Sequence, residues 1–503
     1  MRCRFVSFLT LCLVAGWGRP GGQSEEVGAR WGTESRERVF YRMESIPIAE
    51  DLVVEAAAFE LLPDGRLAVG TRRGDIYLVS GFDEEKPEPV YDLYATGLDE
   101  IFAINSHSRG LYVTQSCELT LVQDTDKDGR ADRFDTISDA WGYENYHEYA
   151  FGSPFDSEGN IYVALGLSAS YYSRALFRGW VLKVTPEGRS VPFASGLRSP
   201  GGIGFNEQGA LFYIESQGPW NSSCSLKFLP EGGFMGHPVS FNWYDYAPNL
   251  GVRPNEPTSG SSIVVEKETV KELVPYSVIF PYIRMGRSIT GFQVDQTQGL
   301  FGPFANQIFL GDYTQSLVMR ASTEKVKGVW QGACYPFREG FSTGILNLQF
   351  TQNGHLITGG TNRGWPVRGM KPFALERLQW TGKMPFEIKL LTVTPTGFSI
   401  ELTQPIAETS PFDSSTVELS TFTHKYHAGY GGPEINQTTP EWTVARVSPD
   451  RKTVELKLKE LLKGHVYEFH LNGVISERGE SLVHKDAYYT LNEIPLLDSP
   501  EEI

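Results

Sequence analysis

Short apolar segments recur along most of the chain, and a tight turn containing glycine joins each to the next. A typical copy runs from Phe59 through the turn at Asp64-Gly65 into the alternating segment that ends at Val69. Apolar alternation around an Asp-Gly or Asn-Gly turn is typical of a β-hairpin. The six copies have their turn glycines at Gly65, Gly110, Gly159, Gly209, Gly299 and Gly354.

The spacing of these turns predicts the architecture. Successive turn glycines lie 45, 49, 50, 90 and 55 residues apart. Four short antiparallel strands and their turns need about 40 to 50 residues, the length of one propeller blade. We therefore expect a six-bladed β-propeller over residues 45–380. The long interval holds a stretch rich in Pro and Gly, 218–287, interpreted as an insertion between strands over one propeller face. A seventh, degenerate blade is the alternative.

Beyond about Lys383 the pattern changes to alternating strands at short spacing. This texture predicts a small β-sandwich of immunoglobulin or fibronectin type over residues 383–495, followed by a tail, 496–503. The whole chain is therefore expected to be all-β. Five histidines, His484 among them, lie in the sandwich region. His465 and His470 would face opposite sides of one strand, which argues against a shared metal site.

Composition agrees with this fold and narrows the function. The chain has 503 residues, of which 40% are hydrophobic and 13% aromatic, with 52 Gly and 30 Pro. This is the balance of a globular protein with many turns, and it disfavours a helix bundle. Lys and Arg number 45 against 61 Asp and Glu, a formal net charge of −16. Such a surface repels phosphate backbones, so a nucleic-acid partner is not expected.

The first residues resemble an export signal. Residues 1–18 combine a charged start, an apolar core and a small-residue end, as secretory signals do. The apolar core is far shorter than the roughly 20 residues that span a bilayer. We expect an exported protein, periplasmic or extracellular, without a membrane span, and a linker over 19–44. After cleavage only Cys117, Cys224 and Cys334 remain, so at most one disulfide forms.

One loop carries the pattern of a calcium site. Oxygen-bearing side chains occupy positions 1, 3, 5, 9 and 12 around Gly129 at position 6. Ca²⁺ takes several oxygen ligands from a short loop of this kind. A structural calcium site is predicted here, and a metal-free acidic turn is the alternative. The candidate residues are Asp124, Asp126, Asp128, Arg130, Asp132 and Asp135.

Three polar segments occupy equivalent places in successive blades. They are the segment around His147, the segment around Arg198, and the run Glu215 to Pro219. Equivalent loops of a propeller converge on one axial mouth, where ligands bind. An imidazole titrates near neutral pH, which suits His147 to be a general base. The motifs HExxH, the Walker loop and GxSxG are absent from the sequence.

These segments, within residues 45–375, resemble the soluble glucose/sorbosone dehydrogenases, which are six-bladed quinoprotein propellers that use calcium and pyrroloquinoline quinone. The resemblance implies that His147 takes the hydroxyl proton while hydride passes to the quinone. It implies that Arg198, in Leu-Arg-Ser-Pro-Gly-Gly, faces the quinone carboxylates. It also implies that the backbone carbonyls of Gly218 and Pro219, in Gln-Gly-Pro, bind an active-site calcium. The C-terminal segment resembles a sandwich found in exported bacterial proteins of this group.

The chain departs from this family at the expected cofactor cations. The family's cofactor lysine falls near Thr314 and its paired arginines fall near 344–346, where the chain has no basic residue. Arg284 and Arg287 are the candidates to replace these charges. The leading hypothesis is calcium-dependent, quinone-linked oxidation of a sugar or other alcohol, with an unidentified electron acceptor. The alternative is a non-catalytic propeller that binds glycan or protein, with the sandwich as a further contact surface.

Overall fold

The computed structural model describes residues 31–145, 147–167 and 171–497. The predicted export signal and the last part of the tail lie outside these residues. Within them, no helix is both long and apolar enough to cross a membrane. The cysteines of the described part are free thiols, with Cys117 exposed and Cys224 and Cys334 buried.

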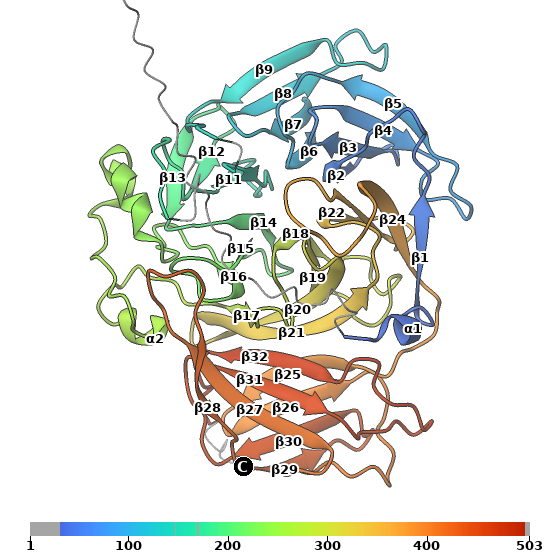
Figure 1. Ribbon diagram of the computed structural model, residues 1–503, viewed down its shortest axis with the longest axis vertical. Helices are drawn as coiled ribbons and strands as arrows, with labels where there is room; N and C mark the ends of the chain where they lie inside the picture. Colours follow the sequence, from blue (N-terminus) through green and yellow to red (C-terminus); the bar gives the residue numbers. More distant parts are fainter. Residues whose placement is uncertain (1–30, 146, 168–170, 498–503) are drawn as a thin grey trace, which may run out of the picture.

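Six blades, each of four antiparallel strands, form a ring, which confirms the all-β class and the six-bladed propeller (Figure 1). The alternative of a seventh blade is wrong, because the long interval completes the fourth. The blades, from the inner to the outer strand, are β2 (Ala56–Leu61), β3 (Leu67–Thr71), β4 (Ile76–Ser80) and β5 (Val90–Ala95); β6 (Ala103–His107), β7 (Gly110–Thr114), β8 (Leu119–Gln123) and β9 (Arg133–Ser138); β10 (Ala150–Phe151), β11 (Ile161–Leu165), β12 (Trp180–Val184) and β13 (Ser190–Ser195); β14 (Pro200–Phe205), β15 (Leu211–Glu215), β16 (Cys224–Phe228) and β17 (Val278–Phe280); β18 (Ile289–Val294), β19 (Ile308–Asp312), β20 (Leu317–Val326) and β21 (Val329–Glu339); and β22 (Ile345–Phe350), β23 (Leu356–Thr361), β24 (Phe373–Trp380) and β1 (Tyr41–Ile46).

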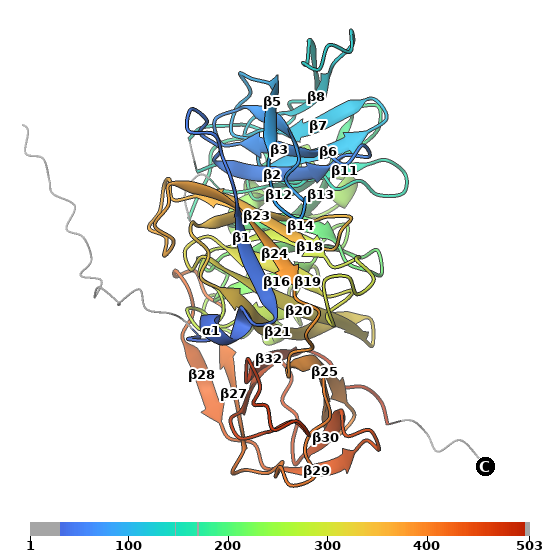
Figure 2. The same cartoon turned by 90° about the vertical axis from the view of Figure 1, so that its right-hand side faces the viewer.

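Two distant parts of the chain close the ring. The N-terminal strand β1 pairs antiparallel with β24, with Tyr41 opposite Trp380, and so becomes the outermost strand of the sixth blade. Figure 2 shows β1, in dark blue, beside the orange strand β24. This strand begins inside the stretch 19–44 that was expected to be a linker. Its backbone hydrogen bonds hold the first blade against the last.

Neighbouring blades pack face to face, so the inner strands are buried on both sides. Every residue of β3 and of β15 is buried, whereas the outer strand β5 alternates between exposed and covered positions. The blades approach so closely that a Cβ atom at Gly204 would lie 2.4 Å from the Phe292 ring. Glycine at this position lets the two sheets meet at the density of a protein interior.

The insertion lies at the rim of the propeller. It connects β16 to β17 and contains η1 (Pro238–Tyr246), η2 (Pro248–Leu250) and α2 (Ile263–Glu266). It had been predicted over one face, but it lies along β13, the outer strand of the third blade, as the green segment beside the ring in Figure 1. The Gly232 N–H donates to Phe193 O (2.8 Å), and the Ser195 N–H donates to Gly233 O (2.9 Å). The reason is that an outer strand exposes unpaired backbone groups, which this segment satisfies.

The predicted sandwich follows the propeller. One sheet contains β25 (Ile388–Thr394), β26 (Gly397–Leu402), β30 (Thr453–Leu458) and β29 (Trp442–Val447), and the other contains β32 (Asp486–Leu491), β31 (His465–Leu471), β27 (Val417–His424) and β28 (Glu434–Thr438). Between them Phe398 packs against Tyr467, Phe469 and Tyr489, with ring centroids 4.8 to 5.2 Å apart.

The propeller and the sandwich share one continuous sheet. The outer strand β21 of the fifth blade pairs antiparallel with β32, with Ala333 opposite Tyr489, to give eight strands in a row. Strands β20 and β21 have 10 and 11 residues, against five or six in most other blade strands, so their hairpin extends beyond the propeller. Figures 1 and 2 show the sandwich attached below this blade. The sequence had predicted two successive units without this pairing.

A buried ionic cluster lies where the N-terminal segment, the fifth blade and the sandwich meet. His484 places Nδ1 2.7 Å from Glu387 Oε1 and Nε2 2.8 Å from Glu37 Oε1, at the end of α1 (Glu34–Glu37). Arg338, in β21, donates to the other oxygen of Glu37 at 3.0 Å. Burial lowers the pKa of His484, but the carboxylates of Glu387 and Glu37 outweigh it and raise the pKa to about 9. The imidazolium is therefore the folded-state form at neutral pH.

This cluster makes stability depend on pH in alkaline solution. Because the folded-state pKa of His484 lies above the ordinary value near 6.5, its stabilisation is complete below pH 6.5 and is lost as pH rises through about 9. We expect the melting temperature to fall between pH 7 and pH 9.5, and the variant His484→Gln to lose most of that slope. Equal slopes in wild type and variant would contradict this assignment.

Candidate functional site

The candidate residues gather on one face of the propeller, defined here as the upper face, where the inner strands begin. The strands of a blade are antiparallel, so the turn between the second and third strands returns to the same face. His147 precedes β10, Arg198 precedes β14, and Gln217 to Pro219 follow β15. The three segments lie on this face: Arg198 Nη1 donates to Gln217 O at 3.0 Å, and its charge acts on His147. They do not all occupy equivalent places, because Gln217 to Pro219 follow the second strand of the blade that Arg198 precedes.

His147 is half-buried against an aromatic wall. Its ring stacks on Trp365, from the β23–β24 turn of the sixth blade, with centroids 5.8 Å apart and planes at 23°. Burial and the positive charge of Arg198 both lower the pKa of His147 below its ordinary value. The imidazole is therefore neutral at neutral pH and able to accept a proton, as the sequence-based role of a general base requires.

Hydrogen bonds from Arg178 hold the segment that carries His147. The sequence did not identify Arg178 as a functional residue. The guanidinium is fully buried and donates to the backbone carbonyls of Glu148 (2.6 Å), Gly142 (2.8 Å) and Ser116 (2.6 Å). Burial lowers the pKa of Arg178 to about 10. One cation thus binds both ends of the His147 segment to the neighbouring blade. Arg178 lies just before β12, and no motif around it in the sequence indicates this role.

A buried ion pair between Glu215 and Lys227 holds the segment that carries Arg198. The Glu215 carboxylate accepts the backbone N–H groups of Arg198 and Ser199, and lies 3.1 Å from Lys227 Nζ. Both charged groups of that pair are buried. The Arg198 guanidinium then lies over the ring of Tyr430, 5.1 Å from its centroid. Tyr430 belongs to the sandwich, so no propeller motif could have identified it.

A network of ion pairs braces the rest of the upper face. Arg72 donates to Glu100 at 2.8 Å and to the Tyr149 hydroxyl at 3.2 Å. Arg363 contacts Glu100 at 3.2 Å and Glu55 at 3.4 Å. These charges neutralise one another and connect blades one, two, three and six. Because Arg363 lies two residues before Trp365, the network also helps to place the aromatic wall.

The predicted calcium position at Gly218 does not fit a metal ion. The Gly218 carbonyl accepts the N–H of Gly431 at 3.1 Å and that of Asn221 at 3.2 Å, which uses both lone pairs of the oxygen. A Cβ atom at Gly218 would lie 2.3 Å from Arg198 Nε. A guanidinium therefore already lies beside this turn. Pro219 pairs with Tyr430 in an isolated antiparallel bridge.

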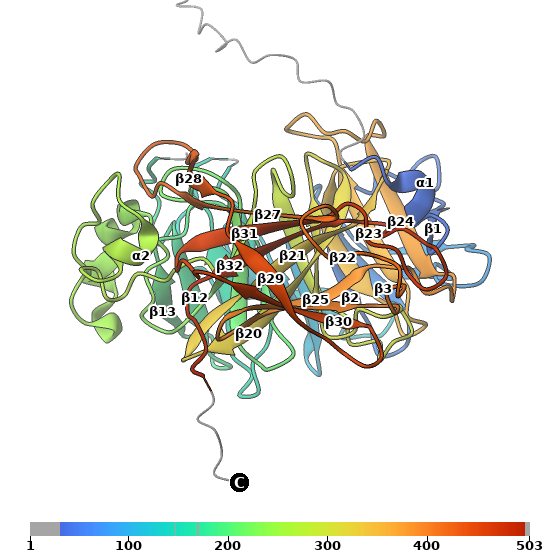
Figure 3. The same ribbon diagram turned by 90° about the horizontal axis from the view of Figure 1, so that it is seen from below.

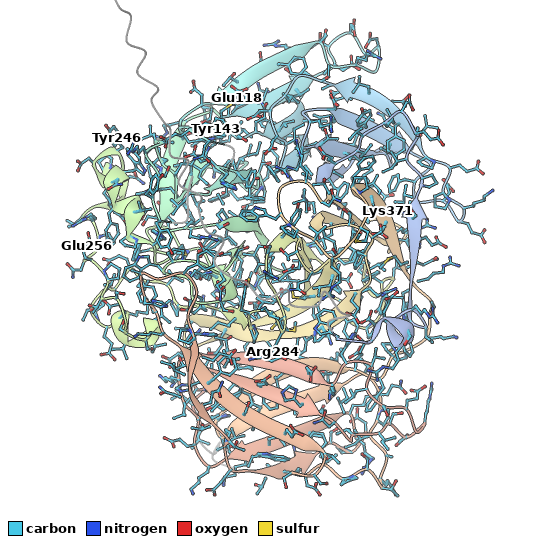
Figure 4. All side chains as sticks on the ribbon, viewed as in Figure 1. Glu118, Tyr143, Tyr246, Glu256, Arg284 and Lys371 are labelled. Atoms are coloured by element: carbon cyan, nitrogen blue, oxygen red, sulfur yellow. The ribbon has the colours of Figure 1, made fainter. Side chains whose placement is uncertain are left out.

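Of the two arginines predicted to replace the family's cofactor cations, one is engaged elsewhere. Arg284 lies at the boundary with the sandwich (Figure 4), 2.6 Å from Glu434 and 3.4 Å from Glu468. Its charge is compensated there, so Arg284 does not supply a cofactor contact. Arg287 stays exposed on the upper face. Thr314 contacts Ser288 Oγ at 3.1 Å, and no lysine stands in its place. A tricarboxylate cofactor would therefore lack the charge-assisted hydrogen bond that a lysine at this position would donate.

The predicted calcium loop joins β8 to β9, away from the upper face. Asp124, Asp126 and Asp128 bring their carboxylate oxygens within 4.8 Å of one another. Asp132 instead accepts Thr125 N–H (2.8 Å), and Asp135 pairs with Arg133 at 2.9 Å. The Arg130 N–H donates to Asp128 at 2.8 Å. Three of the five predicted carboxylates therefore share one place, and a metal there stays a prediction.

A cavity of about 230 Å³ lies among the inner strands of the propeller. Its walls include Phe102, Phe151 and Phe292, together with the glycines of β14. None of the candidate site residues predicted from the sequence lines it. The cavity therefore belongs to the axial channel and not to the His147 cluster.

A sequence-family profile described as a domain of unknown function, DUF7133, matches residues 90–331. No curated protein matches the sequence.

Several solved structures are similar in fold. The PQQ-bound aldose sugar dehydrogenase of Streptomyces coelicolor shares 14% identity over 67% of this chain and 98% of its own, with a TM-score of 0.43. The holo PQQ domain of a pyranose dehydrogenase from Coprinopsis cinerea shares 10%, over 67% and 95%, with a TM-score of 0.45. A Thermus thermophilus oxidoreductase described as a glucose dehydrogenase shares 18%, over 67% and 99%, with a TM-score of 0.46. These are proteins of the kind that the sequence resembles, and at such identities the likeness concerns the fold alone.

If the acidic loop binds calcium, the melting temperature should depend on the metal. A cation that binds only the folded state stabilises it by mass action. Excess chelator should therefore lower the melting temperature of the wild type and leave that of Asp126→Ala unchanged. The matched control is Asp135→Asn, which should stay sensitive because Asp135 pairs with Arg133 outside the cluster. A wild-type melt that is indifferent to chelator would rule out the calcium loop.

Proposed function

We propose that the upper face of this propeller binds a sugar or another polyhydroxyl ligand beside His147. One observation carries the proposal: two aromatic faces flank the His147 and Arg198 pair. Trp365 is 59% exposed and Tyr430 is 54% exposed, although both contact the polar residues of the cluster. Aromatic rings with an apolar face and nearby polar groups are typical of ligand sites that orient a ring.

The polar groups supply the complementary chemistry. A neutral His147 offers an acceptor for a hydroxyl group, as its lowered pKa allows. Arg198 offers donors in a fixed geometry, since the Glu215 and Lys227 pair holds its backbone. The interactions that would hold these side chains are present without a ligand. Little ordering is then needed on binding, which favours affinity.

Quinone-linked oxidation of a sugar or alcohol is the second candidate. The lowered pKa of His147 favours it, because a neutral imidazole is the form that accepts a proton in the reaction. The occupied Gly218 carbonyl and the missing cations weigh against a calcium and quinone pair at this site. We therefore propose binding as the function that the site supports best. Export through residues 1–18 to the periplasm or outside is a further proposal.

Ligand titration tests this function. Calorimetry against glucose, galactose, mannose and their uronic acids should find at least one ligand, and Trp365→Ala should weaken it by at least about tenfold, or about 1.4 kcal/mol. His147→Ala should weaken the same ligand. The matched control is Tyr246→Ala, since Tyr246 is equally exposed (62%) but lies in the rim insertion (Figure 4). A wild-type protein that binds no member of the panel would refute the proposal.

The same preparation separates the two candidates. Loaded with calcium and pyrroloquinoline quinone, the protein should reduce no artificial dye with any sugar that it binds. Turnover that falls by about 10²- to 10⁴-fold in His147→Ala would favour the oxidase instead.

A further inference from the structure

The sandwich reaches onto the upper face of the propeller. The loop between β27 and β28, residues 425–433, leaves the sandwich and runs along the turn 217–222 that follows β15. Figures 2 and 3 show β28 on the same side of the molecule as the orange loop between β23 and β24, which carries Trp365. Loop 425–433 and turn 217–222, about 200 residues apart in the chain, therefore form one surface.

Backbone hydrogen bonds join the loop to the turn. The Trp220 N–H donates to His427 O (2.9 Å), the Gly431 N–H to Gly218 O (3.1 Å), and the Gly432 N–H to Ser222 O (2.8 Å). Pro219 and Tyr430 form one isolated antiparallel bridge, and together these hydrogen bonds fix how the two segments lie against each other. Gly431 has φ +66°, a value that favours glycine, and a Cβ atom there would lie 2.7 Å from the Gln217 side chain.

Anchors at both ends hold the loop in place. Tyr426 is fully buried, its hydroxyl donates to Gly236 O at 2.6 Å, and its ring packs on Trp220 with centroids 5.0 Å apart. At the other end Glu434 pairs with Arg284 of the propeller at 2.6 Å. A loop held in this way is part of the folded architecture, and its position does not depend on a bound ligand.

The loop occupies one of the two backbone carbonyls, those of Gly218 and Pro219, that were predicted to bind calcium. The Gly431 N–H donates to the Gly218 carbonyl, and the Tyr430 ring packs against the guanidinium of Arg198 beside that carbonyl. Tyr282 lies close enough to Tyr430 for an electrostatic interaction, and it is hydrogen-bonded to the Arg287 side chain. Along this edge of the upper face, Tyr430 and Tyr282 therefore lie between Arg198 and Arg287.

We propose that loop 425–433 closes the axial metal position and supplies Tyr430 as a wall of the ligand site, so that the sandwich determines which ligand the propeller accepts. Arg198 replaces the metal ion as the positive group, and the exposed ring of Tyr430 selects the ligand ring that lies against it. The second half of this proposal rests on the proposed function, whereas the first half does not.

Calcium stoichiometry tests the closed metal position without any ligand. The full chain, equilibrated with calcium and then desalted, should retain at most one equivalent, and Asp126→Ala should retain none. Both values follow if the acidic loop is the only tight site. A second equivalent in the wild type, or an equivalent that survives in Asp126→Ala, would overturn the proposal. A wild type without calcium would support the closed position and would count only against the acidic loop.

Sugar titration tests the role of Tyr430. With the tightest ligand found in the sugar panel, Tyr430→Ala should weaken binding by at least about tenfold and change the order of preference within the panel. Tyr430→Phe should restore both, because the ring face and not the hydroxyl forms the wall. Tyr430 is half exposed, so neither change threatens the fold. Unchanged affinity and preference in Tyr430→Ala, in a protein that binds sugar, would refute this role and leave the proposed function intact.

Discussion

The pairing of β21 with β32 is the constraint on which the rest of the structure depends. An outer propeller strand exposes backbone groups that must find partners, and here the sandwich sheet supplies them. The boundary is closed by hydrogen bonds between buried groups: Asn492 donates to Tyr276 O (2.7 Å), and Gln331 donates to the Tyr489 hydroxyl (2.9 Å). The sandwich therefore has one fixed orientation. Its loop 425–433 reaches the upper face because of that orientation.

The site is held by buried charges that are fully engaged. Arg178 donates to four backbone carbonyls around the His147 segment, and the Glu215 and Lys227 pair binds the Arg198 segment. Such pairs add little net stability against an apolar core, but removal of one partner leaves an uncompensated charge and is costly. Their effect is to give His147 and Arg198 a single arrangement. The cluster at His484 does the same for the joint between propeller and sandwich.

The sequence allowed prediction of the repeating elements and of the groups fixed by local spacing. Glycine turns at a regular period predicted the six blades, and the spacing of Asp124, Asp126 and Asp128 predicted their cluster. Equivalence between blades brought His147 and Arg198 to one face. Contacts between distant segments gave no such signal. The partner of Arg284 lies 150 residues away, and Tyr430 meets the propeller only because β21 pairs with β32.

One measurement tests the account most directly: a crystal structure of the full chain soaked with calcium, pyrroloquinoline quinone and the sugar that binds best. The account predicts calcium only between Asp124, Asp126 and Asp128, the sugar between Trp365 and Tyr430, and loop 425–433 still bonded to Gly218. Calcium on the Gly218 carbonyl, with quinone beside it and the loop displaced, would contradict the account.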